Sequence, residues 1–168
     1  MLRPFKFAAL ITGCCAILLS LMSCKNEPAT LTSEQVILVK QGVDQMMNGV
    51  AKDLSTEGPF AWQKYFEEIP EFFMASDGEL VLPSGDSAKQ FIIHSLSKQV
   101  RKIELKWGAI RIDPITVNIA LVGAEWNEQI INSSDSTILY GGYFTAAAEK
   151  SVGGWRFRNA HWSNKKGK

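Results

Sequence analysis

Cysteine is scarce in this sequence and absent from most of it. The 168 residues contain three cysteines, Cys14, Cys15 and Cys24, and none follows them. A folded part that begins after residue 24 therefore has no thiol for a disulfide, for redox chemistry or for a cysteine-based zinc site. Histidine is also rare, because His94 and His161 are the only two. Two histidines without a cluster of acidic residues do not make a metal signature, so the sequence predicts no metal ion and no cofactor.

Long apolar runs are confined to the start of the chain. Arg3 and Lys6 precede an apolar segment that extends from Phe7 to Met22. This run is shorter than the roughly 20 residues that a membrane-spanning helix needs, and a positive flank before a short apolar core is typical of a signal peptide. No later segment of the sequence approaches the length of a span.

The apolar segment ends in Leu21-Met22-Ser23-Cys24, which resembles the lipobox of bacterial lipoproteins. The resemblance implies that residues 1–23 are a signal peptide, that Cys24 is acylated, and that residues 24–30 form the lipidated cysteine and a linker. Cleavage before Cys24 leaves 168 − 23 = 145 residues, enough for about one domain with a real core. The alternative is an uncleaved anchor in which Ser-Cys occurs by chance.

A lipid anchor also sets the expected location. Several acyl chains hold a protein on a membrane without spanning it, so the membrane is one expected partner. Lys25 directly follows the cysteine. The position therefore lacks the aspartate that resembles an inner-membrane retention signal, and the expected location is the bacterial cell envelope, at the outer membrane. The sequence leaves open whether the domain faces the periplasm or the cell surface.

The charge balance argues against a nucleic-acid partner. The whole chain has 18 basic and 17 acidic residues. Removing Arg3 and Lys6 with the leader leaves 16 basic against 17 acidic residues, a net charge of −1. Nucleic-acid-binding domains need a basic patch, which this balance does not supply. The basic tail, residues 164–168, is better explained as a solvated terminus.

The pattern after the linker predicts helices first. Thr32 and Gln35 have the spacing of a capping box, and apolar residues then recur every three or four positions up to Leu54. Such a helix has one apolar face and ends at Gly58-Pro59. A dimeric coiled coil fits the same spacing, but two internal glycines argue against a long zipper. Pro59 can begin a second, short helix that is rich in aromatic residues.

The remainder of the chain predicts a hairpin, a third helix and a long antiparallel sheet. Asp77-Gly78 favours a tight turn within a hairpin at 71–82. From Lys102 onward apolar and polar residues alternate, and Gly108 interrupts the alternation as a bulge does. The expected later elements are a helix at 87–99 and strands at 102–113, 119–131, 137–149 and 154–163.

This order of elements carries a family resemblance. Together with "AWQKYFEEIPEFFMASDGELVLP" in the front half and "GGWRFRNAHWS" at the end, residues 31–163 resemble the SnoaL-like branch of the nuclear-transport-factor-two-like superfamily. The resemblance implies a cone-shaped α+β fold, in which N-terminal helices pack on a long curved antiparallel sheet and leave a pocket. It also implies a possible homodimer through the outer sheet face. The superfamily includes isomerases, polyketide cyclases, dehydratases and members without known catalysis, so the fold alone does not decide function.

Strand parity gives an expectation for the last strand. Trp155, Phe157 and His161 share one face, and Arg158 and Trp162 share the other. We expect the face with Trp155 and Phe157 to point inward, which makes His161 a catalytic candidate, able to hydrogen-bond a ligand or act as an acid or base. The alternative is a structural histidine bonded to a neighbouring strand.

Ten side chains are expected to line the pocket. They are Trp62, Tyr65, Phe73, Trp107, Arg111, Trp126, Tyr143, Trp155, Phe157 and His161. About half of the aromatic residues are expected to be plain core, since a domain of this size needs that volume. Arg111 is a candidate partner for a ligand carboxylate, and a surface ion pair is its alternative role.

Three functions remain open at this point. The first is a lipid-anchored protein whose pocket binds a small apolar or aromatic molecule without catalysis, because the aromatic set has no convincing catalytic pair beside it. The second is an isomerase, cyclase or dehydratase that acts on a hydrophobic carbonyl compound, with His161 or an inward carboxylate as base. The third is a dimerising interaction module that uses the outer sheet face.

Overall fold

The computed structural model describes residues 30–165. The predicted signal peptide, Cys24, the linker up to residue 29 and the last three residues of the basic tail lie outside the described residues. The elements in chain order are helix α2 (Ser33–Glu57), 3-10 helix η1 (Pro59–Lys64), strands β1 (Phe73–Ser76) and β2 (Glu79–Leu82), helix α3 (Gly85–Phe91), π-helical η2 (Ile92–Leu96), helix α4 (Ser97–Gln99), and strands β3 (Val100–Pro114), β4 (Ile119–Asn132), β5 (Thr137–Ser151) and β6 (Gly154–Asn164).

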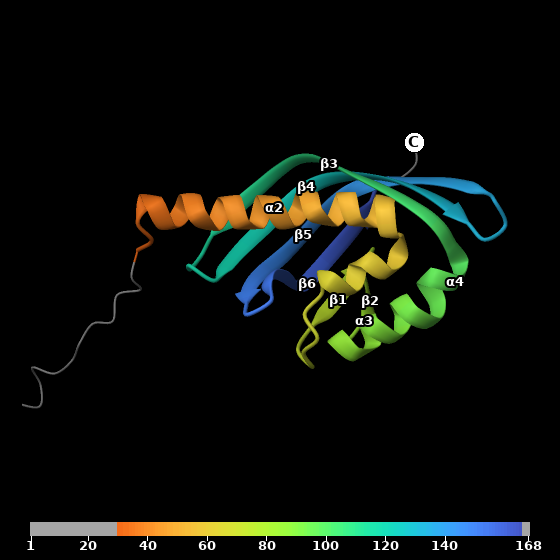
Figure 1. Cartoon of the computed structure of the whole chain (residues 1–168), viewed down its shortest axis with the longest axis horizontal. Helices are drawn as coiled ribbons and strands as arrows, with labels where there is room; N and C mark the ends of the chain where they lie inside the picture. Colours follow the sequence, from red (N-terminus) through yellow and green to blue (C-terminus); the bar gives the residue numbers. More distant parts are fainter. Residues whose placement is uncertain (1–29, 166–168) are drawn as a thin grey trace, which may run out of the picture. The chain divides into compact units, whose positions relative to one another are not determined.

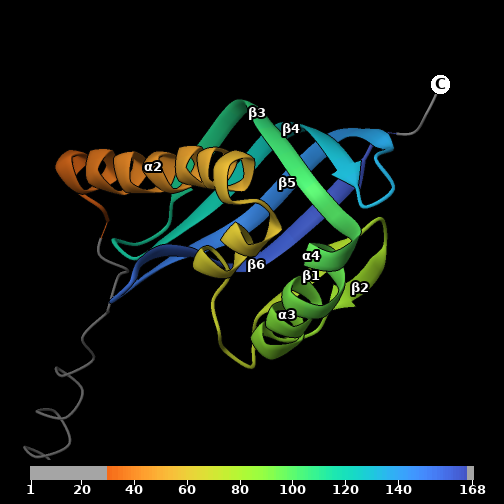
Figure 2. The ribbon, with the colours of Figure 1, turned by 45° about the vertical axis from the view of Figure 1, so that its right-hand side comes forward.

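The architecture is α+β, with helices packed on one curved six-stranded sheet. The strand order is β2-β1-β6-β5-β4-β3, and β3 to β6 form an antiparallel meander. Figure 1 shows α2 lying across this sheet, with η1, the β1–β2 hairpin and α3 to α4 grouped below its C-terminal end. Figure 2, turned by 45°, shows the same layers and the twist of the long strands. The expected helices-then-sheet order is confirmed.

Helix α2 begins and ends where the sequence predicts. The Thr32 N–H donates to Gln35 Oε1 at 2.9 Å, and the Gln35 N–H donates to Thr32 Oγ1 at 3.2 Å, so the capping box is present. The helix ends at Gly58. Its buried side chains are Val39, Val43, Met46, Met47, Val50 and Leu54. This single apolar face packs chiefly against β3, which accounts for the helical spacing of the apolar residues.

The β1–β2 hairpin turns at the predicted dipeptide. Asp77 has φ 50° and Gly78 has φ 93°, and two successive positive φ values are what a tight hairpin turn requires. Strand β1 also pairs in parallel with β6, from Phe73 opposite Asn159 to Ser76 opposite Trp162. This parallel pairing was not predicted; it joins segments more than 80 residues apart and adds two strands to the sheet.

A bulge in β6 overturns the predicted facing of the last strand. Ala147 pairs with Asn159, and Ala148 pairs with Phe157, so Arg158 is the extra residue. Parity therefore changes at Arg158: Phe157 is fully buried, while Ala160 is the next buried residue, three positions later. The prediction that His161 faces inward and Trp162 outward is wrong, because a bulge moves every following side chain to the other face.

Trp162 lies instead at the centre of an aromatic cluster on the inner face. Its ring centroid is 4.5 Å from Phe144, 4.9 Å from Trp126, and 5.8 Å from both Trp107 and Trp62. Gly142 on β5 lets β6 pass at this level, since a Cβ there would lie 1.7 Å from the Ser163 carbonyl oxygen. The inner face of the sheet is thus an aromatic layer facing the helices.

Candidate functional site

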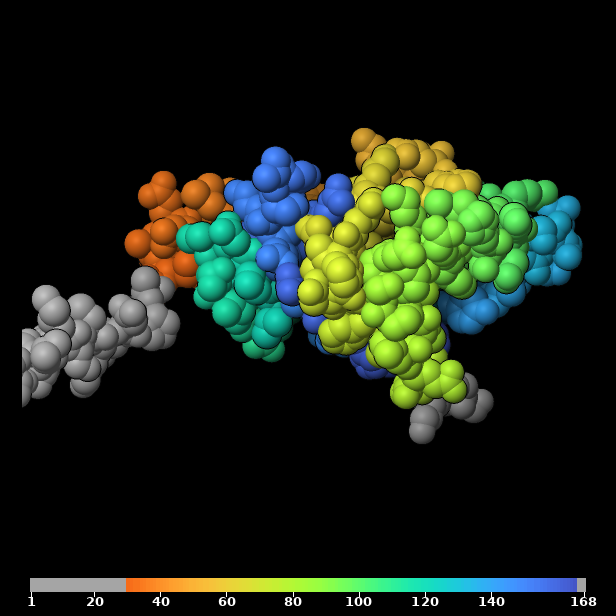
Figure 3. Space-filling view, turned by 90° about the horizontal axis from the view of Figure 1, so that it is seen from below, coloured from red at the N-terminus to blue at the C-terminus, as the bar shows by residue number. Residues whose placement is uncertain are grey.

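An open cavity lies between the inner sheet face, the hairpin and the helix at 85–99. Its volume is about 240 Å³. Figure 3 shows the hairpin and α3 covering this side of the sheet, with the β4–β5 turn extending past them. Its lining is mostly apolar and comprises Trp62, Phe66, Met74, Ser76, Leu82, Phe91, Ile92, Leu96, Ile103, Trp126, Glu128, Ile130, Tyr140, Trp162 and Asn164.

The helical wall of the cavity is positioned by the start of α3. Ser84 caps helix α3, because the Ser87 N–H donates a hydrogen bond to Ser84 Oγ at 3.1 Å. The helix therefore starts at Gly85, two residues earlier than predicted. A Cβ on Gly85 would lie 2.6 Å from the Glu67 carbonyl oxygen, so the helix start packs tightly on the preceding loop. The following turn presents Ile92 and Leu96 to the cavity, opposite Trp126 on β4. The cavity therefore has a helical wall and a sheet wall.

Glu128 is the carboxylate of the cavity wall. It lies on β4 two residues after Trp126, where it pairs with Leu105 on β3 and Tyr140 on β5. Its side chain is half-buried, and burial raises the pKa of the Glu128 carboxyl to about 7. A carboxyl with this pKa exchanges its proton near neutral pH.

Glu128 was not among the predicted site residues, although the sequence carries a signal for it. The inward positions of β4 alternate along the strand as Ala120, Val122, Ala124, Trp126, Glu128 and Ile130. An acidic residue in phase with an apolar face is a buried polar group and deserves a functional explanation. Glu125, three positions earlier, is exposed on the opposite face of the same strand.

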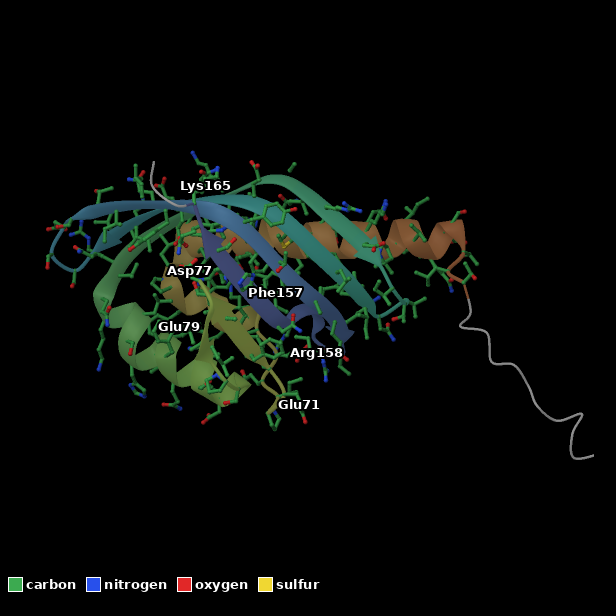
Figure 4. The ribbon with its side chains drawn as sticks, turned by 180° about the vertical axis from the view of Figure 1, so that it is seen from behind. Glu71, Asp77, Glu79, Phe157, Arg158 and Lys165 are labelled. Atoms are coloured by element: carbon green, nitrogen blue, oxygen red, sulfur yellow. The ribbon has the colours of Figure 1, made fainter. Side chains whose placement is uncertain are left out.

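Three further polar side chains, all from strands, line the cavity. Ser76, Tyr140 and Asn164 come from β1, β5 and β6. The Asn164 backbone N–H donates to Asp77 Oδ1 at 2.9 Å, and its side-chain nitrogen donates to Asp77 Oδ2 at 2.5 Å. These bonds lower the pKa of Asp77 and tie the hairpin turn to the end of β6, where Figure 4 labels Asp77 close to Lys165. The position of Asn164 is therefore fixed by the hairpin.

One buried donor also belongs to the cavity wall. Trp126 is 4% exposed, and its Nε1–H has no hydrogen-bond acceptor among residues 30–165. A buried N–H without a partner costs about 1–3 kcal/mol, so such groups usually meet water or a ligand. Trp126 is thus both an apolar wall and a free donor.

Only part of the predicted pocket set comes together. Trp62 and Trp126 line the cavity as predicted. Phe157 is fully buried in the core. Trp107 packs on α2, where its Nε1–H donates to the Met47 carbonyl at 2.8 Å. Trp155 also packs on α2, so closely that a Cβ on Gly42 would lie 2.4 Å from its Nε1. These three are core residues and not part of the cavity wall.

The other five predicted residues also lie away from the cavity. The Tyr65 hydroxyl donates to Asp53 Oδ2 at 2.9 Å, and burial raises the pKa of Tyr65 to about 12. Phe73, Tyr143, Arg111 and His161 are exposed and belong to the outer sheet face. His161 pairs there with Thr145 and Ala75, so it does not reach a ligand in the cavity.

The part of the chain that the structure describes has two further properties. Residues 30–165 contain no group of three or more His, Cys, Asp or Glu side chains placed to hold a metal ion. In the same range no helix has both the length and the apolar character needed to cross a membrane.

Comparisons with known proteins identify the fold. Neither a family model nor a curated protein matches this sequence. Among solved structures, an NTF2-like superfamily protein from Salmonella enterica serovar Typhimurium LT2 superposes with a TM-score of 0.67 at 20% identity, over 79% of this chain and 94% of that one. A scytalone-dehydratase-like protein from Novosphingobium aromaticivorans DSM 12444 gives a TM-score of 0.69 at 14% identity, over 80% and 89%.

A third similar structure is an enzyme by its name. The hexachlorocyclohexane dehydrochlorinase LinA-type3 from Novosphingobium barchaimii LL02 gives a TM-score of 0.61 at 8% identity, over 77% of this chain and 88% of that one. Identities this low show the fold alone. The chain therefore has the nuclear-transport-factor-two-like fold, as the sequence predicted, and its function has to be argued from the cavity.

Proposed function

We propose that this protein binds a small apolar or aromatic molecule in the cavity and does so without catalysis. The observation that carries this proposal is the cavity wall itself, where apolar and aromatic side chains surround a few polar groups. Pockets of this composition are typical of small-ligand sites. A cavity of about 240 Å³ exceeds the roughly 150 Å³ that holds benzene, so it admits a substituted single ring.

The wall also supports binding over chemistry. Isomerase chemistry on this fold needs a carboxylate base together with donors that stabilise the oxyanion, such as a tyrosine and a protonated acid. Within the described residues the wall offers Tyr140 as a donor but has one carboxylate, Glu128, so the second, protonated acid is missing, and both histidines are exposed elsewhere. A single carboxyl group can hold a ligand in place, but it does not complete this catalytic arrangement.

Native mass spectrometry tests the binding proposal. The purified chain is expected to carry a bound small molecule. Leu96→Trp fills the cavity and should lower the fraction of ligand-bound chain at least tenfold. Leu139→Trp is the matched control, because Leu139 is 73% exposed and does not line the cavity. Equal ligand content in both variants would contradict the proposal.

We propose further that the protein is anchored in the cell envelope, at the outer membrane, through a lipid on Cys24. The support is the lipobox-like Leu21-Met22-Ser23-Cys24 after a short apolar core. Cys24→Ala should move the chain from the membrane fraction to the soluble fraction after cell lysis. Unchanged membrane association of Cys24→Ala would contradict the proposed lipid anchor.

A second candidate function is an isomerase, cyclase or dehydratase acting on a hydrophobic carbonyl compound. It is favoured by Glu128, because burial raises its pKa to about 7, the range in which a general base works best. Incubation with hydrophobic ketones in D₂O should then exchange the hydrogens next to the carbonyl. Glu128→Gln should abolish the exchange, and Glu125→Gln, on the opposite face, should leave it intact. Absence of exchange in the unmodified chain argues for binding alone.

The outer sheet face supports the third candidate, self-association. Leu121 and Tyr143 are about half exposed there, at 50% and 45%. Light scattering on a size-exclusion column would give the mass of the unmodified chain and of Tyr143→Glu. A dimer that Tyr143→Glu converts to a monomer supports this role, whereas a monomeric unmodified chain excludes it.

A further inference from the structure

Three tryptophans from distant parts of the chain meet at the cavity wall. Trp62 comes from η1, Trp126 from β4 and Trp162 from β6. The Trp162 ring stands at 89° to each of the other two, with centroids 5.8 Å and 4.9 Å apart. Trp162 also stacks on the core residue Trp107, with an angle of 23° between the two rings. Perpendicular rings backed by the core make a rigid aromatic corner.

The charge on the same wall has one sign. Its titratable side chains are Glu128 and Tyr140, and among residues 30–165 no lysine, arginine or histidine lines it. Aromatic faces carry the negative part of the ring quadrupole, which attracts cations. The aromatic corner and the carboxylate therefore favour the same kind of ligand charge.

The environment of Glu128 leads to the same conclusion. Burial disfavours its charged form, and no cationic side chain of the described residues offsets this effect. A carboxylate in apolar surroundings is stable when an opposite charge lies beside it. A bound cation would supply that charge, and its apolar substituents would contact the tryptophans.

We propose that the ligand of this cavity is a small organic cation, an ammonium group with apolar or aromatic substituents, paired with Glu128 and packed against Trp62, Trp126 and Trp162. This inference rests on the proposed binding function, because it names the ligand class of the same cavity. A trimethylammonium group spreads its charge over methyl groups, so it loses less hydration on burial than a primary amine. That property suits a wall with few hydrogen-bond acceptors.

Two isosteric probes test the inference on the full purified chain. Phenyltrimethylammonium and tert-butylbenzene have the same shape, and they differ in a positively charged nitrogen in place of a carbon. Tryptophan fluorescence at pH 8 reports binding, since three tryptophans line the cavity. The cation is expected to bind at least tenfold more tightly than the hydrocarbon.

Variants assign this preference to named side chains. Glu128→Gln should reduce the preference to about threefold or less, the part that cation–π contacts alone supply. Glu125→Gln removes a carboxylate from the outer face of the same strand and should leave the preference unchanged. Tyr140→Leu should weaken cation binding while Tyr140→Phe retains it, and Tyr140 is 43% exposed, so both variants should fold.

The outcomes separate this inference from the proposed function. If tert-butylbenzene binds as tightly as phenyltrimethylammonium or more tightly, the ligand is not a cation, and the proposed binding function is unaffected. Binding of neither probe would overturn both. A tenfold preference that persists in Glu128→Gln would refute the pairing with Glu128.

Discussion

Glu128→Gln should make the stability of this protein less dependent on pH. The carboxyl has a pKa of 4.5 in an unfolded chain, and burial raises it to about 7 in the folded state. Below pH 4.5 both states are protonated. Between pH 4.5 and 7 the unfolded state ionises first, so the free energy of unfolding falls as pH rises. Above pH 7 both states are ionised and the loss is complete. Glutamine does not ionise, so Glu128→Gln removes this fall in the free energy of unfolding between pH 4.5 and 7.

The size of the effect follows from the two pKa values. The difference between 4.5 and about 7 corresponds to roughly 3–4 kcal/mol, at about 1.4 kcal/mol per pH unit. Because the side chain is only half-buried, water at the cavity mouth reduces the cost, and we expect about 1–3 kcal/mol. Glu104, Lys106 and Tyr140 are the other titratable groups that line a neighbouring hollow together with Glu128. A change at one of these groups is the main competing source of pH dependence.

Urea unfolding at several pH values between 4 and 8 measures this effect. From pH 4 to pH 8 the free energy of unfolding of the variant should rise by about 1–3 kcal/mol relative to that of the unmodified chain. In thermal unfolding the same change corresponds to roughly 3–10 °C in melting temperature. Glu125→Gln, which removes an exposed carboxylate from the same strand, should show no such gain. Parallel pH profiles for the unmodified chain and Glu128→Gln would refute the reasoning.

Three further predictions test the fold around the cavity. Trp162→Ala should cost about 3–5 kcal/mol of unfolding free energy in urea titrations, whereas His161→Ala should stay within about 0.5 kcal/mol, and the reverse order would mean that the β6 bulge is absent. Gly142→Ala should lower the melting temperature by about 5 °C or more, because its Cβ would meet the Ser163 carbonyl, while Gly153→Ala meets a movable Arg156 side chain; equal effects would contradict the close approach. Thr32→Ala should cost about 1 kcal/mol through loss of the N-cap, and an unchanged urea midpoint would argue against the capping box.

Local signals in the sequence were enough for most of the elements. The capping box at Thr32 and the Asp77-Gly78 turn depend on residues a few positions apart, so the sequence carries them directly. The bulge near Gly108 was also predicted, because the apolar phase of the strand visibly restarts after it. The comparison with solved structures then confirmed the fold that this order of elements resembles.

The cavity was less accessible to sequence reasoning. The bulge at Arg158 leaves no mark in the sequence, because Trp155 and Phe157 before it and His161 after it keep one regular alternation. Its position is fixed by pairing with β5 and β1, which are distant in the sequence. Exchanging the faces of His161 and Trp162 moved the histidine to the outer surface and brought a third tryptophan to the wall. Glu128, in contrast, could have been found from the sequence, because it stands in phase with the apolar residues of β4.

The sequence by itself determined the elements, their order, the lack of cysteine chemistry after residue 24 and the α+β class, because these follow from composition and from contacts between near neighbours. Only the tertiary structure decided which side chains share the cavity. That choice depends on strand register, on one extra residue in β6 and on the parallel pairing of β1 with β6. Each of these is set by packing between segments far apart in the chain, and a one-residue change in register reverses which side chains face the ligand.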